Sequence, residues 1–166
     1  MKRVKLFALI SLLFVGLGHA WGANTLVNFI GGTSNDLTSL DYVSASGLGS
    51  DYAESNAPYR VKLDNTGDYI LLSLPSTPTS IEIEVKMLGG ATTSSIAIKE
   101  CATESGTFTT VETMSISGAQ NSVISFTSSK TFTQKFIKLE FTKGSNVGLG
   151  KLVVYSSSGG VTYTDD

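Results

Sequence analysis

The chain has 166 residues, of which 41% are hydrophobic and 16% charged, and its formal net charge is −2. This length fits one domain with a core large enough to fold without disulfides or metals. A mildly acidic chain repels phosphate backbones, whose binding depends on Lys and Arg, so the composition argues against a nucleic-acid partner. Gly, Ser and Thr are abundant, Pro is scarce and no segment has a helical period, which predicts an all-β fold.

The first twenty residues have the pattern of a cleaved signal peptide. A basic start at residues 2–5 is followed by an apolar run over 6–17 and a small-residue cleavage site at 18–20. The alternative is a membrane anchor, but the apolar run is shorter than the roughly twenty residues that a span needs. Cleavage leaves residues 21–166, with nine Lys and Arg against fourteen Asp and Glu. We therefore expect a secreted, periplasmic or cell-surface protein with no membrane span after cleavage.

Nothing in the sequence predicts a catalytic centre. The single cysteine, Cys101, allows no internal disulfide, so stability must come from the core. A nucleophilic Cys101 would need a base, but the only histidine, His19, lies in the predicted signal peptide. Cys101 is better interpreted as a strand-end residue. No cluster of Cys and His is present for zinc.

Strand signals follow one another along the rest of the chain, about eight to fifteen residues apart. They lie at residues 24–30, 59–63, 68–74, 81–87, 94–100, 107–117, 123–127, 137–141 and 152–155, with a possible short strand at 40–43. Apolar and polar residues alternate most clearly in 81–87 and 137–141, so each of these strands has one core face and one solvated face. Eight or nine such strands predict an antiparallel β-sandwich of jelly-roll type.

Two local signals concern the chain path. Residues 59–63 and 68–74 flank a turn-forming tetrad at 64–67, which predicts a β-hairpin. Pro75 and Pro78 then end the second strand, because neither can donate to a ladder.

Near the end of the chain, glycines precede the last predicted strand. Gly144, Gly148 and Gly150 predict a corner with positive φ angles, and 152–155 then closes the sandwich. Such a glycine-rich stretch superficially resembles a phosphate loop, but it lacks the Lys-Ser/Thr pair and the following helix. Residues 157–166 have the composition of a flexible Ser/Gly tail.

The segment 33–57 is the least regular part of the chain, and long irregular connections in compact domains are often functional. It contains four acids, Asp36, Asp41, Asp51 and Glu54. Jelly-roll modules often hold a structural Ca²⁺ ion, which prefers six to eight oxygen ligands. The spacing matches no known calcium loop, so solvated acids are the preferred interpretation and a structural calcium remains the alternative.

Three stretches together resemble a known family. They are residues 56–70, 85–90 and 141–150. The chain resembles the jelly-roll, galactose-binding-like modules found in exported proteins of Bacteroides-type gut bacteria, over most of residues 24–155. The resemblance implies a single β-sandwich domain, here residues 21–156. Such modules serve as carbohydrate-binding domains, adhesive domains or structural appendages of surface hydrolases.

Tyrosines and polar side chains gather in and after the irregular segment. Sugar binding needs flat aromatic surfaces for the apolar face of a pyranose and polar groups for its hydroxyls. The candidate ligand-binding residues are Tyr52, Asn56, Tyr59, Arg60, Lys62, Asp68 and Tyr69. The alternative is that these tyrosines simply pack at a sheet margin, where tyrosine is a favoured strand residue.

The sequence thus predicts a secreted, non-catalytic binding module, with glycan binding or adhesion as its preferred function. The alternative from another class is a structural or protein-interaction module with a cell-envelope protein as its partner. A small hydrolase is disfavoured because no nucleophile motif is present and no histidine follows the signal peptide. No cofactor is expected.

Overall fold

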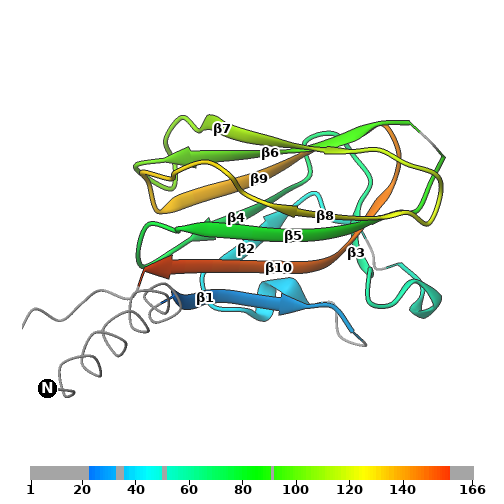
Figure 1. Ribbon diagram of the computed structural model, residues 1–166, viewed down its shortest axis with the longest axis horizontal. Coiled ribbons are helices and arrows are strands. Elements are labelled where there is room, and N and C mark those ends of the chain that lie inside the picture. The colour runs from blue at the N-terminus through cyan, green and yellow to red at the C-terminus, as the bar shows by residue number, and fades with distance from the viewer. Residues whose placement is uncertain (1–22, 33–35, 50–51, 91, 158–166) are drawn as a thin grey trace, which may run out of the picture.

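The computed structural model describes residues 23–32, 36–49, 52–90 and 92–157, which form a sandwich of two five-stranded antiparallel sheets (Figure 1). The strands are β1 (Ala23–Ile30), β2 (Val43–Ser46), β3 (Val61–Leu63), β4 (Tyr69–Ser73), β5 (Ser80–Met87), β6 (Ser94–Cys101), β7 (Thr109–Ile116), β8 (Val123–Thr127), β9 (Phe136–Thr142) and β10 (Val147–Ser157). Two short 3-10 helices, η1 (Leu37–Ser39) and η2 (Glu54–Asn56), lie between β1 and β3. The all-β sandwich prediction is confirmed, with ten strands in the described residues.

Several sequence predictions fall outside these residues. The predicted signal peptide at 1–20 and nearly all of the predicted tail at 157–166 are not among the described residues, and neither is Asp51. The described part of the chain contains no helix with the length and hydropathy needed to cross a bilayer.

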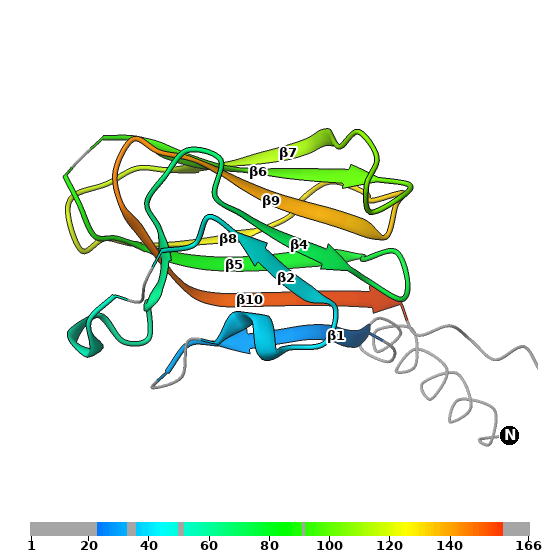
Figure 2. The same cartoon turned by 180° about the vertical axis from the view of Figure 1, so that it is seen from behind.

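The two sheets have different strand orders. In sheet A the order is β1-β10-β5-β8, and β3 also pairs with β10. In sheet B the order is β2-β4-β9-β6-β7. Figure 1 is seen from the side of sheet A and Figure 2 from the side of sheet B. The first strand and the last strand lie side by side, because Ala23 pairs with Ser157 at one end of the β1–β10 ladder.

The inner faces of the sheets form one hydrophobic core. On β5 the side chains of Ile81, Ile83 and Val85 are buried, as the alternating pattern predicts. On β9 the corresponding core residues are Leu139 and Phe141. Each such side chain contributes roughly 1.5–3 kcal/mol by its removal from water, so the core provides the main stabilisation of the sandwich. The single cysteine ends β6 and is buried and free, consistent with a strand-end residue.

The predicted hairpin at 59–74 is wrong. Its two strands belong to different sheets, since β3 pairs with β10 whereas β4 pairs with β2 and β9. The turn residues are those expected, with Gly67 at a φ of +97°, but the turn carries the chain from one sheet to the other. Asp68 holds this crossing because its Oδ2 accepts the backbone N–H groups of Asp64 (2.9 Å) and Asn65 (2.8 Å). A turn signal marks a change of direction without specifying the partner strand.

The predicted glycine corner is also wrong in part. β10 begins at Val147 and not near 152, and it includes Gly148 and Gly150. None of Gly144, Gly148 and Gly150 has a positive φ. These glycines are required by close approach instead. A Cβ on Gly150 would lie 2.4 Å from Cδ1 of Tyr59, and one on Gly148 would lie 2.3 Å from the Tyr59 carbonyl oxygen. The tyrosine therefore lies directly on the outer surface of β10.

The possible strand at 40–43 begins later than expected. Strand β2 starts at Val43 and pairs with β4, with Val43 opposite Leu72. The residue before it, Tyr42, has a φ of 66°, which prevents the extended conformation from starting earlier.

Candidate functional site

The predicted site tyrosines are divided between the two outer faces of the sandwich. The hydroxyl of Tyr59 donates to Oε1 of Glu84 (2.7 Å), and Glu84 alternates with the core residues of β5 on the outside of sheet A. Tyr69 begins β4 and precedes the buried Ile70, so its side chain lies on the outside of sheet B. No single binding surface can include both tyrosines.

A second group surrounds Tyr52 in the segment before β3. The backbone N–H of Tyr52 donates to the Arg60 carbonyl oxygen (3.1 Å), and Nε of Arg60 donates to the Tyr52 carbonyl oxygen (3.2 Å). The ammonium of Lys62 lies 5.6 Å from the Tyr52 ring centroid and 2.7 Å from a carboxylate oxygen of Asp64. Asn56 is half-buried, and its carbonyl oxygen accepts the N–H of Tyr59 (2.7 Å). Most polar groups of this cluster thus form contacts within the protein that stabilise this segment.

The Tyr52 hydroxyl is buried without a hydrogen-bond partner among the described residues. Burial, together with the charges of Asp64 and Asp68, raises the pKa of this hydroxyl. A small cavity of about 160 Å³ is lined by Lys62, by Asp36 and by neighbouring residues of both. This volume is below that of ordinary ligand pockets, so the cavity is too small for a sugar chain.

Asp68 differs from the other candidates because only 2% of its surface is exposed. Its carboxylate closes the turn between the sheets through the two backbone bonds described above. We therefore leave Asp68 out of the proposed site.

The outer face of sheet A is closed by internal contacts around Tyr59. The Glu84 carboxylate accepts hydrogen bonds from the hydroxyls of Tyr59 and Ser125 (3.2 Å for Ser125). Lys151 forms an ion pair with Glu82 (2.6 Å). The bond to Glu82 is the main cause of a raised pKa for Lys151. Lys86, also on β5, lies 5.9 Å from the Tyr59 ring centroid, so this face carries one ring beside a cation where sheet B carries two.

Tyr59 gives a testable pH dependence. Burial and, after it, the hydrogen bond to Glu84 raise the pKa of Tyr59 from 10.0 to about 12. Below pH 10 both the folded and the unfolded chain hold this proton. Between pH 10 and 12 only the unfolded chain releases it, so stability is expected to fall as the pH rises through this window. In an ultraviolet titration of tyrosinate, Tyr59→Phe should remove amplitude from the high-pH step.

The control for this titration is Glu84→Gln, which removes the charge but keeps a hydrogen-bonding side chain. It should bring the pKa of Tyr59 closer to its ordinary value of 10.0. A high-pH step of unchanged amplitude in Tyr59→Phe would show that Tyr59 does not titrate there.

The outer face of sheet B presents aromatic rings around a cation. The ammonium of Lys138, on β9, lies 4.9 Å from the ring centroid of Tyr69 and 4.6 Å from that of Phe108. Phe108 comes just before β7, so the cluster spans the sheet from β4 to β7. Beside it, Lys99 on β6 pairs with Glu140 at 2.5 Å. This combination of flat rings and charged groups is the arrangement that sugar recognition needs.

Sequence reasoning identified Tyr69 but missed Phe108 and Lys138. Lys138 was interpreted only as part of a solvated face, and the pairing of β4 with β9 was needed to place it beside Tyr69. Phe108 lies within the predicted strand 107–117, whereas β7 begins only at Thr109, so the alternation along this strand does not fix the direction of its ring. The alternation in β9 was the one available signal, because it put Lys138 on the outer face.

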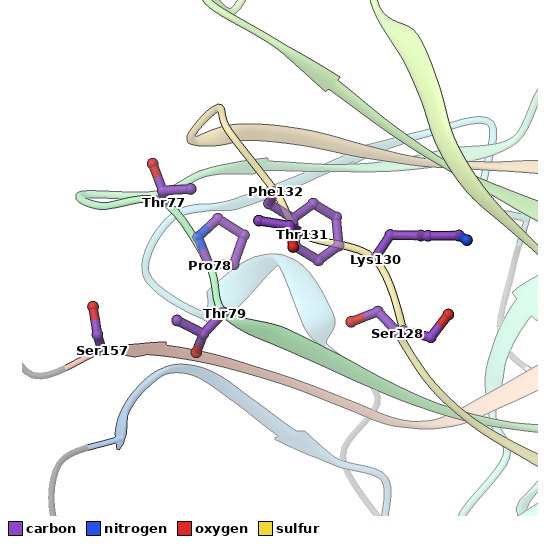
Figure 3. Close-up of a pocket in the computed structure, with 9 residues that line it drawn as sticks. Thr77, Pro78, Thr79, Ser128, Lys130, Thr131, Phe132 and Ser157 are labelled. Atoms are coloured by element: carbon purple, nitrogen blue, oxygen red, sulfur yellow. The ribbon is translucent and has the colours of Figure 1, made fainter.

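A larger cavity lies at another place, where the β4–β5 and β8–β9 connections meet the end of β10 (Figure 3). Its volume is about 490 Å³, and it is lined by Thr77, Pro78, Thr79, Ser128, Ser129, Lys130, Thr131, Phe132 and Ser157. Several hydroxyls are already used: Ser128 accepts the N–H of Ile81 (2.9 Å), and Ser129 donates to Glu112 (2.6 Å). None of the predicted site residues lines this cavity.

Within the described ranges no three or more His, Cys, Asp or Glu side chains are grouped so as to hold a metal ion. Asp36, Asp41 and Glu54 therefore form no such group with one another or with other described residues. Since Asp51 is not described, the structural calcium stays a prediction.

Comparison with known proteins places the fold. No protein-family model and no curated protein sequence matches the chain. Among solved structures, the chain is similar to a xylan-binding domain of family 22, with 13% identity and a TM-score of 0.51. The match covers 86% of this chain and 99% of that domain. The C-terminal family 22 carbohydrate-binding module of Clostridium thermocellum Xyn10B covers 82% and 96%, with 12% identity and a TM-score of 0.51. The chain shares the β-sandwich fold of these carbohydrate-binding modules.

A third structure is larger than this chain. The chain matches a truncated AlyQ that has CBM32 and alginate lyase domains, at 15% identity and a TM-score of 0.47. The match covers 83% of this chain but only 35% of that one. The expected resemblance to a jelly-roll module is confirmed for the fold by the two family 22 structures, while the bacterial group and the compartment stay predictions.

Proposed function

We propose that this protein is an exported, non-catalytic module that binds a glycan on the outer face of sheet B. The observation that carries the proposal is the position of Tyr69 and Phe108 on either side of Lys138. Aromatic rings pack against the apolar C–H face of a pyranose, and charged side chains such as Glu140 and Lys99 bond its hydroxyls. The shared fold with a xylan-binding domain supports the same class of ligand.

The alternative of a protein-interaction module has less support. Such a module would present a contiguous apolar patch of several hundred Å². The large hydrophobic side chains that are exposed in the described residues are Ile30, Tyr42 and Val123. Ile30 and Val123 lie on β1 and β8, at opposite edges of sheet A, and Tyr42 precedes the edge strand β2 of sheet B. Ile30 and Val123 are thus separated by the width of sheet A, so the three side chains do not form one contiguous patch.

A glycan array tests the proposal, run on the purified protein with calcium and again with a chelator. We expect a reproducible hit, and dependence on calcium would indicate the structural ion. Tyr69→Ala and Phe108→Ala should each weaken binding about tenfold, because an aromatic stacking contact is worth roughly 0.5–1.5 kcal/mol beyond its area. Isothermal titration with the array hit measures these changes.

The matched control is Tyr59→Ala, which removes a tyrosine from the outer face of sheet A. It should leave the affinity unchanged, with folding of all three variants checked by thermal unfolding. Loss of binding in Tyr59→Ala alone would move the site to sheet A. A blank array from well-folded protein would overturn the proposal and favour the protein-interaction module.

A further inference from the structure

Lys138, the cation in the aromatic cluster, has no anionic partner among the described residues. Among the described residues the side-chain ion pairs join Lys62 to Asp64, Lys99 to Glu140 and Lys151 to Glu82, and none includes Lys138. Its ammonium instead lies against the rings of Tyr69 and Phe108. A cation held by aromatic faces alone gains about 0.5–1 kcal/mol at an exposed site, less than a well-formed ion pair with a ligand can give.

A second lysine lies next to it. Lys99 on β6 is directly opposite Lys138 in the antiparallel ladder with β9. Like charges in directly opposed positions destabilise a sheet. Glu140 compensates Lys99, whereas Lys138 remains uncompensated within the described residues. This part of sheet B is therefore locally cationic on a chain with more acids than bases.

We propose that the ligand of this face is a carboxylated sugar, and that Lys138 selects it. The inference rests on the proposed function and specifies its substrate class. The ammonium lies between the two ring faces on which a sugar would stack. A ligand carboxylate draws the ammonium into an ion pair and leaves a ring free for the sugar. A neutral sugar must displace the ammonium from the rings without gaining that pair.

This arrangement makes Lys138 a specificity-determining residue with two opposite effects. Its removal takes away the ion pair that an acidic sugar forms. The same change opens the faces of Tyr69 and Phe108 to neutral sugars. Substitution is therefore expected to exchange one preference for the other and not simply to abolish binding.

Matched ligands test the inference. We would measure the affinity of the purified protein for oligomers of polygalacturonate and polyglucuronate and for the same oligomers after reduction of their carboxyl groups. At least one carboxylated oligomer should bind roughly tenfold more tightly than its reduced form, with the preference decreasing as salt is added. Lys138→Gln should lose this preference and bind the reduced form at least as well as the unchanged protein does. Lys151→Gln, on sheet A, is the control and should keep the preference.

The outcomes separate the two proposals. Equal or tighter binding of reduced or neutral oligomers by the unchanged protein would overturn the inference and leave glycan binding intact. A preference retained in Lys138→Gln would overturn the role of Lys138. Binding to no saccharide of the array would overturn the proposed function and this inference together.

Discussion

Replacing Phe141 with alanine is expected to lower the free energy of unfolding by about 3–5 kcal/mol. Phe141 is among the largest fully buried side chains, with 1% of its surface exposed. Its backbone also contacts the turn between the sheets, because the N–H of Phe141 donates to the Asp68 carbonyl oxygen (2.8 Å). Alanine leaves a cavity that the fixed sheets cannot close. Urea denaturation followed by circular dichroism measures the change.

The control is Phe136→Ala, the same substitution on the same strand. Phe136 lies on the outer face of β9 and is half-buried, so its loss should cost clearly less. Equal costs for the two variants would contradict the assignment of the inner and outer faces. If the Phe141→Ala protein does not fold, Phe141→Leu retains most of the volume and should unfold at a lower denaturant concentration than both the unchanged protein and Phe136→Ala.

Replacing Asp68 with alanine is expected to cost about 3 kcal/mol of stability, since two part-buried hydrogen bonds to a charged acceptor are lost. The N–H groups of Asp64 and Asn65 would lose their partner in the crossing between the sheets. Asp68→Asn keeps one acceptor oxygen and should lose less. The measurement is the midpoint and slope of chemical denaturation.

Asp64→Ala provides the matched control, because it removes a carboxylate from the same turn. Asp64 pairs with Lys62 at a half-buried position, and such pairs typically contribute 1 kcal/mol or less, about a third of the effect expected at Asp68. If Asp68→Ala unfolds at the same denaturant concentration as the unchanged protein, its carboxylate does not hold the crossing.

Much of the fold was predictable from strand periodicity. The runs 81–87 and 137–141 alternate cleanly, and they correspond to β5 and β9 with a difference of one residue at their ends. Alternation reports which side chains of a strand face the core, and burial of every second residue enforces it. The sandwich architecture followed from the number and spacing of such runs.

Pairing between strands was less predictable, because it depends on contacts between distant segments. The turn before Asp68 had the composition of a hairpin, yet β3 and β4 pair with strands far away in sequence. Likewise, Gly148 and Gly150 indicated a corner, whereas they are strand residues covered by a tyrosine from another segment. The sequence of one strand does not specify which distant side chain will pack against its outer face.

The same limit applied to the candidate site. Tyrosines near one another in sequence, Tyr59 and Tyr69, are separated by the crossing between the sheets. The cluster that replaces them combines Tyr69, Lys138 and Phe108 from distant parts of the chain. Which faces they share became visible only with the order β4-β9-β6-β7.

The position of β10 has a consequence for how the protein is made. Three of the four strand pairs of sheet A, those with β1, β3 and β5, are formed on this last strand. A chain that emerges from its N-terminus presents these strands long before β10 is available, and pairing across such long sequence separations is slow. Sheet A therefore cannot be completed until residues 147–157 have emerged. Until then β1, β3 and β5 lack the strand with which they pair in the folded protein.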